Sequence, residues 1–364
     1  TFGSTLDSDS TARALTITAG TGNIDFDGAV GGVVGGTTPL GAVTINSASN
    51  VTADQSFSAA SLRQVAGSGT TTFMGALDTT QVAGILVDGT NFNFNDTVSL
   101  TLGDLDVDAT GTVRFNGLVT TSDADNGLVT ITNGGQLTIT ASGDMDLEGA
   151  FLQDGAGVVL TAGDITTTND NVTFQTAVTL TGAVDIDTGA GAGTIAFNDT
   201  LNSVANEANT LAITAGTGNI DFDGAVGNTN ALGAVTINSA ATLTADEVFK
   251  AVSFTQRAGS VATQFDGAVT LTGNFDFTGT ALTLNAAGNT VGGTTDVANS
   301  GLFTTADNAD MIVMGQFTQD GTGSSRLGGD LTASAGMDFA SAIALIGTDA
   351  VTLVTSGAAG QDIV

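Results

Sequence analysis

Apolar and polar residues alternate in short runs along most of this chain. In the segment from Val98, VSLTLGDLDVDATGTVRFNG, Val98, Leu100 and Leu102 are separated by Ser99 and Thr101. Leu105 and Val107 then alternate with aspartates, and Val113 and Phe115 flank an arginine. Successive side chains of a strand point to opposite faces, so each run places apolar residues on one side and polar residues on the other. The segment therefore predicts three short strands, each with an inner and an outer face.

The pattern repeats along the chain. Leu15–Val30, LTITAGTGNIDFDGAV, returns at Leu211–Val226 with Thr16 replaced by Ala212. The similarity continues downstream, so that residues 15–77 resemble residues 211–269. Between these matched stretches, the connection 31–39 corresponds to the shorter 227–231, as expected of a surface loop on a stacked repeat. A block of coils has been duplicated.

A shorter period lies beneath the duplication. Phe73, Phe94 and Phe115 are 21 residues apart, and Phe174, Phe197 and Phe222 follow in similar contexts. A period in the low twenties with about three strands predicts a β-solenoid of about 16 coils. The fold class predicted is all-β, a single-stranded parallel β-helix over residues 15–364. Residues 1–14 are expected to be an irregular lead-in or a worn first coil. The phenylalanines are expected to stack inside successive coils.

The amino-acid composition argues against helical folds, nucleic acid partners and membrane insertion. Lys and Arg total 6 against 37 Asp and Glu, a formal charge of −31, and only three of the acids are Glu. The near absence of Glu and Lys argues against helices. An acidic surface argues against nucleic acid as a partner, because phosphate binding needs clustered Lys and Arg. No apolar run approaches the roughly 18 residues of a membrane-spanning helix, so we expect no membrane insertion. The sequence starts at Thr1 without a leader, and we expect a processed or excised piece.

The sequence has few of the residues that enzymes use for catalysis. The chain has no His and no Cys, which removes His-based and thiol-based sites together. Its five arginines and one lysine are scattered. We therefore expect no enzyme. The alternative is a carbohydrate-processing β-helix enzyme, which would need clustered carboxylates in one groove.

Paired aspartates flank an apolar residue at five places and are the candidate metal ligands. The pairs are Asp25 and Asp27, Asp106 and Asp108, Asp144 and Asp146, Asp185 and Asp187, and Asp221 and Asp223. Both carboxylates of a pair should leave the outer face of one strand, about 6.5–7 Å apart. Stacked on a neighbouring coil, they could bind Ca²⁺, which prefers several oxygen ligands. No cofactor is required by this reading. The competing interpretation is a solvated polar face.

The motifs LTITAGTGNIDFDGAV and VTLTGAVDIDTG resemble the β-strand repeats of bacterial surface proteins, namely filamentous-haemagglutinin-like and autotransporter-type adhesins. The resemblance implies a right-handed parallel β-helix displayed outside the cell. The Asn-Pro secretion motif of that family is missing, since the single proline, Pro39, follows Thr38.

The function expected is an extracellular structural or adhesive shaft or filament subunit of a cell surface or matrix, including biofilm. The expected partners are further copies stacked end to end, adjoining parts of a longer chain, or surface polysaccharide. Such partners would cover the unpaired strand edges at the ends of a solenoid. A Ca²⁺-dependent binding module is the remaining alternative.

Overall fold

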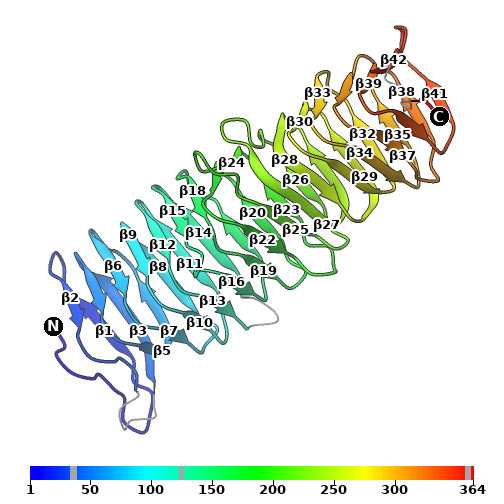
Figure 1. Cartoon of the computed structure of the whole chain (residues 1–364). Helices are drawn as coiled ribbons and strands as arrows, with labels where there is room; N and C mark the ends of the chain where they lie inside the picture. Colours follow the sequence, from blue (N-terminus) through cyan, green and yellow to red (C-terminus); the bar gives the residue numbers. More distant parts are fainter. Residues whose placement is uncertain (33–38, 123–126, 357–361) are drawn as a thin grey trace. The chain divides into compact units, whose positions relative to one another are not determined.

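A computed structural model describes residues 1–32, 39–122, 127–356 and 362–364. The described residues form strands and turns with no helix, and the fold is a parallel β-solenoid of about 15 turns. This confirms the predicted fold class. The chain divides into two compact units, Thr1–Thr176 and Ala177–Val364, which are described separately. Figure 1 shows their strands, coloured in chain order.

The strands of the first unit are mostly three to five residues long. They are β1 Leu15–Thr18, β2 Ile24–Phe26, β3 Leu40–Ser47, β4 Val51–Ala53, β5 Phe57–Gln64, β6 Thr70–Phe73, β7 Leu77–Thr79, β8 Ile85–Gly89, β9 Asn91–Phe94, β10 Val98–Leu100, β11 Leu105–Ala109, β12 Val113–Phe115, β13 Val119–Thr121, β14 Val129–Asn133, β15 Leu137–Ile139, β16 Met145–Leu147, β17 Phe151–Gln153, β18 Val159–Thr161, β19 Ile165–Thr167 and β20 Val172–Phe174.

These strands stack in three parallel ladders, one on each side of the coil. One ladder runs β2–β4–β6–β9–β12–β15–β18. The second runs β5–β7–β10–β13–β16–β19. The third runs β1–β3–β5–β8–β11–β14–β17–β20. The segment from Val98 supplies one strand to each ladder, as its alternation predicts. In β12, Val113 and Phe115 are fully buried while Arg114 is exposed.

The first residues already belong to the stack. Phe2 and Leu6 form parallel bridges with Phe26 and Val30. The rings of Phe2 and Phe26 stack with centroids 5.0 Å apart. Residues 2–6 therefore form part of a first coil, which is joined to the next coil by isolated bridges and not by full strands.

The second unit is built in the same way. Its strands are β21 Val178–Leu180, β22 Val184–Asp187, β23 Ile195–Phe197, β24 Leu201–Ser203, β25 Leu211–Thr214, β26 Ile220–Phe222, β27 Leu232–Ala245, β28 Phe249–Gln256, β29 Gly259–Phe265, β30 Val269–Leu271, β31 Phe275–Gly279, β32 Ala281–Leu284, β33 Asn289–Val291, β34 Thr295–Asn299, β35 Phe303–Thr305, β36 Met311–Val313, β37 Phe317–Gln319, β38 Ser325–Leu327, β39 Leu331–Ala333, β40 Met337–Phe339, β41 Ile343–Leu345 and β42 Leu353–Thr355.

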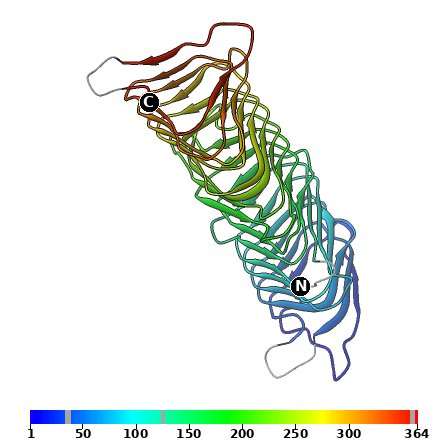
Figure 2. The ribbon, with the colours of Figure 1, turned by 90° about the vertical axis from the view of Figure 1, so that its right-hand side faces the viewer.

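Its strands also stack in parallel ladders (Figure 2). The rungs from β31 to β36 are paired in register. One ladder runs β22–β25–β27–β28–β31–β34–β37–β40. Another runs β23–β26–β27–β29–β32–β35–β38–β41. The third includes β28–β30–β33–β36–β39–β42.

The duplicated blocks keep the same local irregularity. The β1–β3 register shifts between Ile17 and Thr18, and the β25–β27 register shifts between Ile213 and Thr214. The copies differ in that β3 and β4 are separate strands, whereas their counterpart is the single strand β27. Most of the longer connection, residues 33–38, lies outside the described residues.

The phenylalanines are inside the coils, but they do not form the single series that their spacing predicts. Phe73, Phe94 and Phe115 stack in β6, β9 and β12, with centroids 5.8 and 4.9 Å apart. That ladder continues to Ile139 and Thr161. Phe174 belongs instead to the ladder of β17 and β20, where it faces Gln153. The spacing between phenylalanines therefore did not show which of the three sides of the coil each one occupies.

Some inward positions are polar, which the alternation did not predict. Gln153 Nε2 donates to Asn133 Oδ1 over 2.8 Å, and Asn133 Nδ2 donates to the Gly157 carbonyl over 3.1 Å. The same arrangement recurs in the second unit, where Gln319 Nε2 donates to Asn299 Oδ1 over 2.7 Å. Buried amides need such partners, and here neighbouring rungs of the ladder supply them.

Candidate functional site

The five aspartate pairs lie on the outside of the coils, but only two pairs lie wholly within one strand. Asp106 and Asp108 belong to β11, and Asp185 and Asp187 belong to β22. In the other three pairs one member lies beside the strand: Asp27, Asp144 and Asp223. In those three pairs one carboxylate comes from the strand and the other from the residue directly next to it.

The pair in β11 faces one further acid across the ladder. Asp108 is in register with Asp88 of β8, while on the other side Asp106 and Asp108 face Thr130 and Thr132 of β14. Partial burial raises the pKa of the Asp106 carboxyl above its usual value, and the Asp88 and Asp108 charges add to this. The carboxylates of this patch repel one another.

The remaining pairs are engaged in hydrogen bonds within the protein. Thr1 Oγ1 donates to Asp25 Oδ2 over 3.2 Å, and Thr244 Oγ1 donates to Asp221 Oδ1 over 2.8 Å. The Gly189 amide donates to Asp187 Oδ1 over 2.7 Å. Each bond uses one oxygen of one carboxylate and orients that side chain.

The other members of the pairs are surrounded differently. Asp146 is exposed between Thr120 of β13 and Thr166 of β19. Asp185 is exposed beside Ala212 of β25. Partial burial raises the pKa of Asp223, with the Asp246 and Asp221 charges adding to the effect.

A recurrent corner hydrogen bond explains many of the aspartates. At the residue before a strand, a side-chain oxygen accepts the backbone N–H at the same position in the next coil. Asp104 accepts from Leu128, and Asp144 accepts from Asp164, both over 2.9 Å. In the second unit, Asp310 accepts from Asp330 over 2.8 Å.

The corner bond continues from coil to coil and also uses asparagine. Asp330 accepts in turn from the Thr352 amide over 2.6 Å. Asn50, Asn91 and Asn274 make the same bond to Thr70, Thr112 and Thr294. A short side chain reaches the next coil, which accounts for the preference for Asp and Asn over Glu. An Asp or Asn directly before the first inward residue of a strand is the sequence signal for it.

Other acidic positions lack an aspartate two residues away, and sequence inspection missed them. Asp276 of β31 and Asp296 of β34 face each other directly in the ladder. Partial burial raises the pKa of both carboxyls, and for Asp296 the Asp320 and Asp276 charges contribute as well. Partial burial also raises the pKa of Asp78, with Asp96 adding to it.

The described residues do not bring these acids together as a metal centre. No group of three or more His, Cys, Asp or Glu side chains among them could hold a metal ion. Ca²⁺ binding at the five pairs stays a prediction from sequence.

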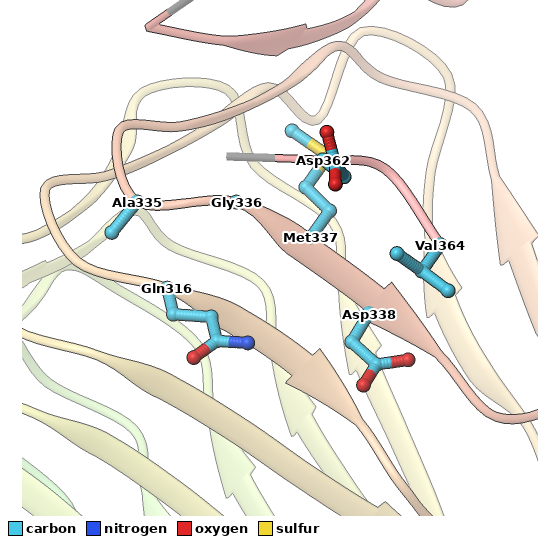
Figure 3. A pocket seen from close by; sticks show the side chains of 7 residues that line it. All are labelled: Gln316, Ala335, Gly336, Met337, Asp338, Asp362 and Val364. Atoms are coloured by element: carbon cyan, nitrogen blue, oxygen red, sulfur yellow. The ribbon is translucent and has the colours of Figure 1, made fainter. Parts of the chain in front are cut away.

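Two hollows accompany the outer faces. One, of about 190 Å³, is lined by Val82, Ala83, Ile85, Leu86, Asp104 and Asp106. The other, of about 150 Å³, lies near β40 and is lined by Gln316, Ala335, Gly336, Met337, Asp338, Asp362 and Val364 (Figure 3). Each set of lining residues includes two aspartates and no basic side chain.

Comparison with family models, curated proteins and solved structures found no match to this chain. No helix in the described ranges is long and apolar enough to span a membrane. The likeness to surface adhesins therefore rests on the repeat motifs alone.

The raised pKa values predict that the folded protein is more stable at mildly acidic pH than at neutral pH. A carboxyl whose pKa is higher in the folded than in the unfolded state stabilises the fold most below its ordinary pKa of 3.8. That stability is lost as the pH rises through the raised value. Thermal unfolding followed by circular dichroism should therefore give a higher Tm near pH 4.5 than at pH 7.

Asp106→Asn should raise the Tm at pH 7 by up to about 2 °C, since exposed charge pairs are worth little individually. It should also weaken the dependence on pH. The matched control is Asp146→Asn, because Asp146 faces threonines and not carboxylates. A Tm that falls in Asp106→Asn, or rises equally in both variants, would contradict this account.

Carboxylates such as those of Asp88, Asp106 and Asp108 repel one another along the ladder, so we expect Ca²⁺ to raise the stability mainly by screening charge. CaCl₂ and NaCl at matched ionic strength should raise the Tm by similar amounts, and EDTA should leave it unchanged in a Ca²⁺-free buffer. A saturating rise at micromolar Ca²⁺ that NaCl does not reproduce would instead establish a specific site. Differential scanning calorimetry measures both arms.

Proposed function

We propose that this chain is a structural or adhesive shaft or filament subunit of a bacterial cell surface or extracellular matrix. The observation that carries the proposal is the in-register parallel stack within each unit. Outward residues of one rung face outward residues of the next, as in the row Asn93, Arg114 and Thr138. An architecture that grows by adding identical rungs suits a role in which length and surface matter.

The interior contacts suit a shaft that has to resist pulling forces. Phenylalanine rings contact their neighbours from coil to coil, as Phe94 and Phe115 do. Backbone hydrogen bonds also join neighbouring coils, and so do corner side chains such as Asn91, which accepts a hydrogen bond from the Thr112 amide. Separating two coils would break all of these contacts together.

The outer surface suits an exposed setting. The charge of −31 favours solubility and disfavours contact with anionic membranes and nucleic acid. Rows of Thr, Asn and Asp offer hydroxyl, amide and carboxylate groups that could hydrogen-bond to surface polysaccharide. The resemblance of the repeats to adhesin shafts agrees with this setting.

The proposal predicts an extracellular location. Antibodies raised against residues 1–364 should label intact producing cells or their surrounding matrix in immunogold electron microscopy. Protease added to intact cells should remove the label, while a cytoplasmic marker protein stays protected. Label confined to the cell interior would contradict the proposal.

A further inference from the structure

The turn between β7 and β8 is longer than its counterpart in the duplicated block. Residues 80–84 connect these two strands, whereas the shorter segment 272–274 connects β30 and β31. The two turns occupy the same place in the coil, since β8 and β31 pair with the equivalent strands β5 and β28. The longer turn carries Val82, whose side chain is 70% exposed. Stacking of coils alone does not account for an apolar side chain at this position.

This turn forms one wall of the hollow of about 190 Å³. Val82 and Ala83 line it from the turn, and Leu86 lines it from the outer face of β8. On the next coil, Asp104 precedes β11 and Asp106 lies on its outer face. The hollow therefore has an apolar side and an acidic side.

Backbone contacts fix the longer turn in place. The Gln81 amide donates to the Ala60 carbonyl of the preceding coil, and the Gly84 amide donates to the Gln81 carbonyl, both over 2.9 Å. Gly103 of the following coil approaches so closely that a Cβ there would lie 2.7 Å from the Val82 carbonyl oxygen. The wall is thus held by the coils before and after it, which lowers the cost of ordering a site when a ligand binds.

The charges around the acidic side are all negative. Partial burial raises the pKa of the Asp106 carboxyl, and the charges that add to this effect are those of Asp88, Asp108, Asp154 and Asp104. Arg63 faces Leu86 from the other side and is two rungs away from Asp106. In the described part of the chain it forms no salt bridge with that carboxylate. A ligand that complements this side must be cationic.

The arrangement of the acids distinguishes between cations. The described carboxylates do not converge on one point, as a metal ion requires. They are spread over rungs about 4.8 Å apart and along strands where alternate residues are about 6.5–7 Å apart. Positive charges separated by a short apolar chain fit this spread and the apolar wall together. A protein partner would need an interface of at least about 1,000 Å², far more than this hollow provides.

We propose that the hollow binds a linear aliphatic polyamine. Its methylene chain packs against Val82 and Leu86, and one ammonium group binds between Asp104 and Asp106. The further ammonium groups pair with carboxylates of the neighbouring rungs, such as Asp88. This inference does not depend on the proposed shaft role and assigns a small-molecule ligand to one coil.

The duplicated block supplies an internal comparison. Asp276 takes the place of Leu86 there, and Asp296 takes the place of Asp106, because β31 and β34 pair as β8 and β11 do. That block keeps adjacent carboxylates beside a turn two residues shorter, which has no counterpart of Val82. Asp296→Asn is therefore the matched control for Asp106→Asn.

Isothermal titration calorimetry of residues 1–364 with spermidine in 0.15 M NaCl tests the proposal, since this salt suppresses diffuse binding to the acidic surface. We expect one saturable site. Asp106→Asn should weaken it by at least about tenfold, because a charge-assisted hydrogen bond is lost. Val82→Ser should weaken it by about threefold or more through lost apolar contact. Asp296→Asn should bind like the wild type, and circular dichroism checks that each variant is folded.

Hexaamminecobalt(III) carries the same charge as spermidine without a methylene chain, so it should bind at least about tenfold more weakly. Equal binding of the two cations, equal losses in Asp106→Asn and Asp296→Asn, or no saturable site would overturn the inference. A lysine tripeptide that binds more tightly than spermidine would also overturn it and assign the hollow to a basic segment of a partner protein. None of these outcomes bears on the location experiment, so the proposed role is tested separately.

Discussion

Parallel, in-register stacking of coils is the constraint on which the rest of this structure depends. Neighbouring strands in such a ladder lie about 4.8 Å apart, so each side chain meets its counterpart from the coil before and the coil after. Inside, this rule brings Phe94 against Phe115 and Phe197 against Phe222. Outside, it brings Asp88 against Asp108 and Asp276 against Asp296.

The same rule has opposite consequences on the two faces. Inward repetition is favourable, because rings stack and buried amides find partners in the next rung. Outward repetition of aspartate is unfavourable, because like charges on adjacent strands repel. The chain tolerates this by interspersing threonine between acids, as Thr120 and Thr166 flank Asp146. It also places aspartates such as Asp104 at corners, where they accept a backbone N–H from the next coil.

Sequence periodicity was sufficient to predict the fold class, because alternation and recurrence act over a few residues and need no knowledge of distant contacts. The segment from Val98 shows this, since the apolar residues of its three strands are buried, while Leu102 lies in the turn after β10 and is half-buried. Spacing could not determine which side of the coil a residue occupies, because turns vary in length. Phe115 and Phe174 were for that reason placed in one series although they belong to different ladders.

The candidate site was less predictable. The Asp-x-Asp motif drew attention to paired carboxylates, but the interactions that matter run between coils and leave no trace in a local motif. Asp276 and Asp296 are 20 residues apart and yet face each other, while Asp144 is part of a pair and binds the Asp164 amide instead. Only the register between coils distinguishes these cases.

A double-cysteine experiment tests that register most directly, because the chain has no cysteine of its own. Asn93 and Arg114 face each other on β9 and β12. At the usual strand spacing, cysteines at these positions lie within the 4.4–6.8 Å between Cα atoms that a disulfide needs, whereas Asn93 and Asn116 are offset by two residues and about 8 Å apart. Mass spectrometry after mild oxidation should find the disulfide in Asn93→Cys/Arg114→Cys and little in Asn93→Cys/Asn116→Cys. Preferential cross-linking of the offset pair would contradict the in-register stack.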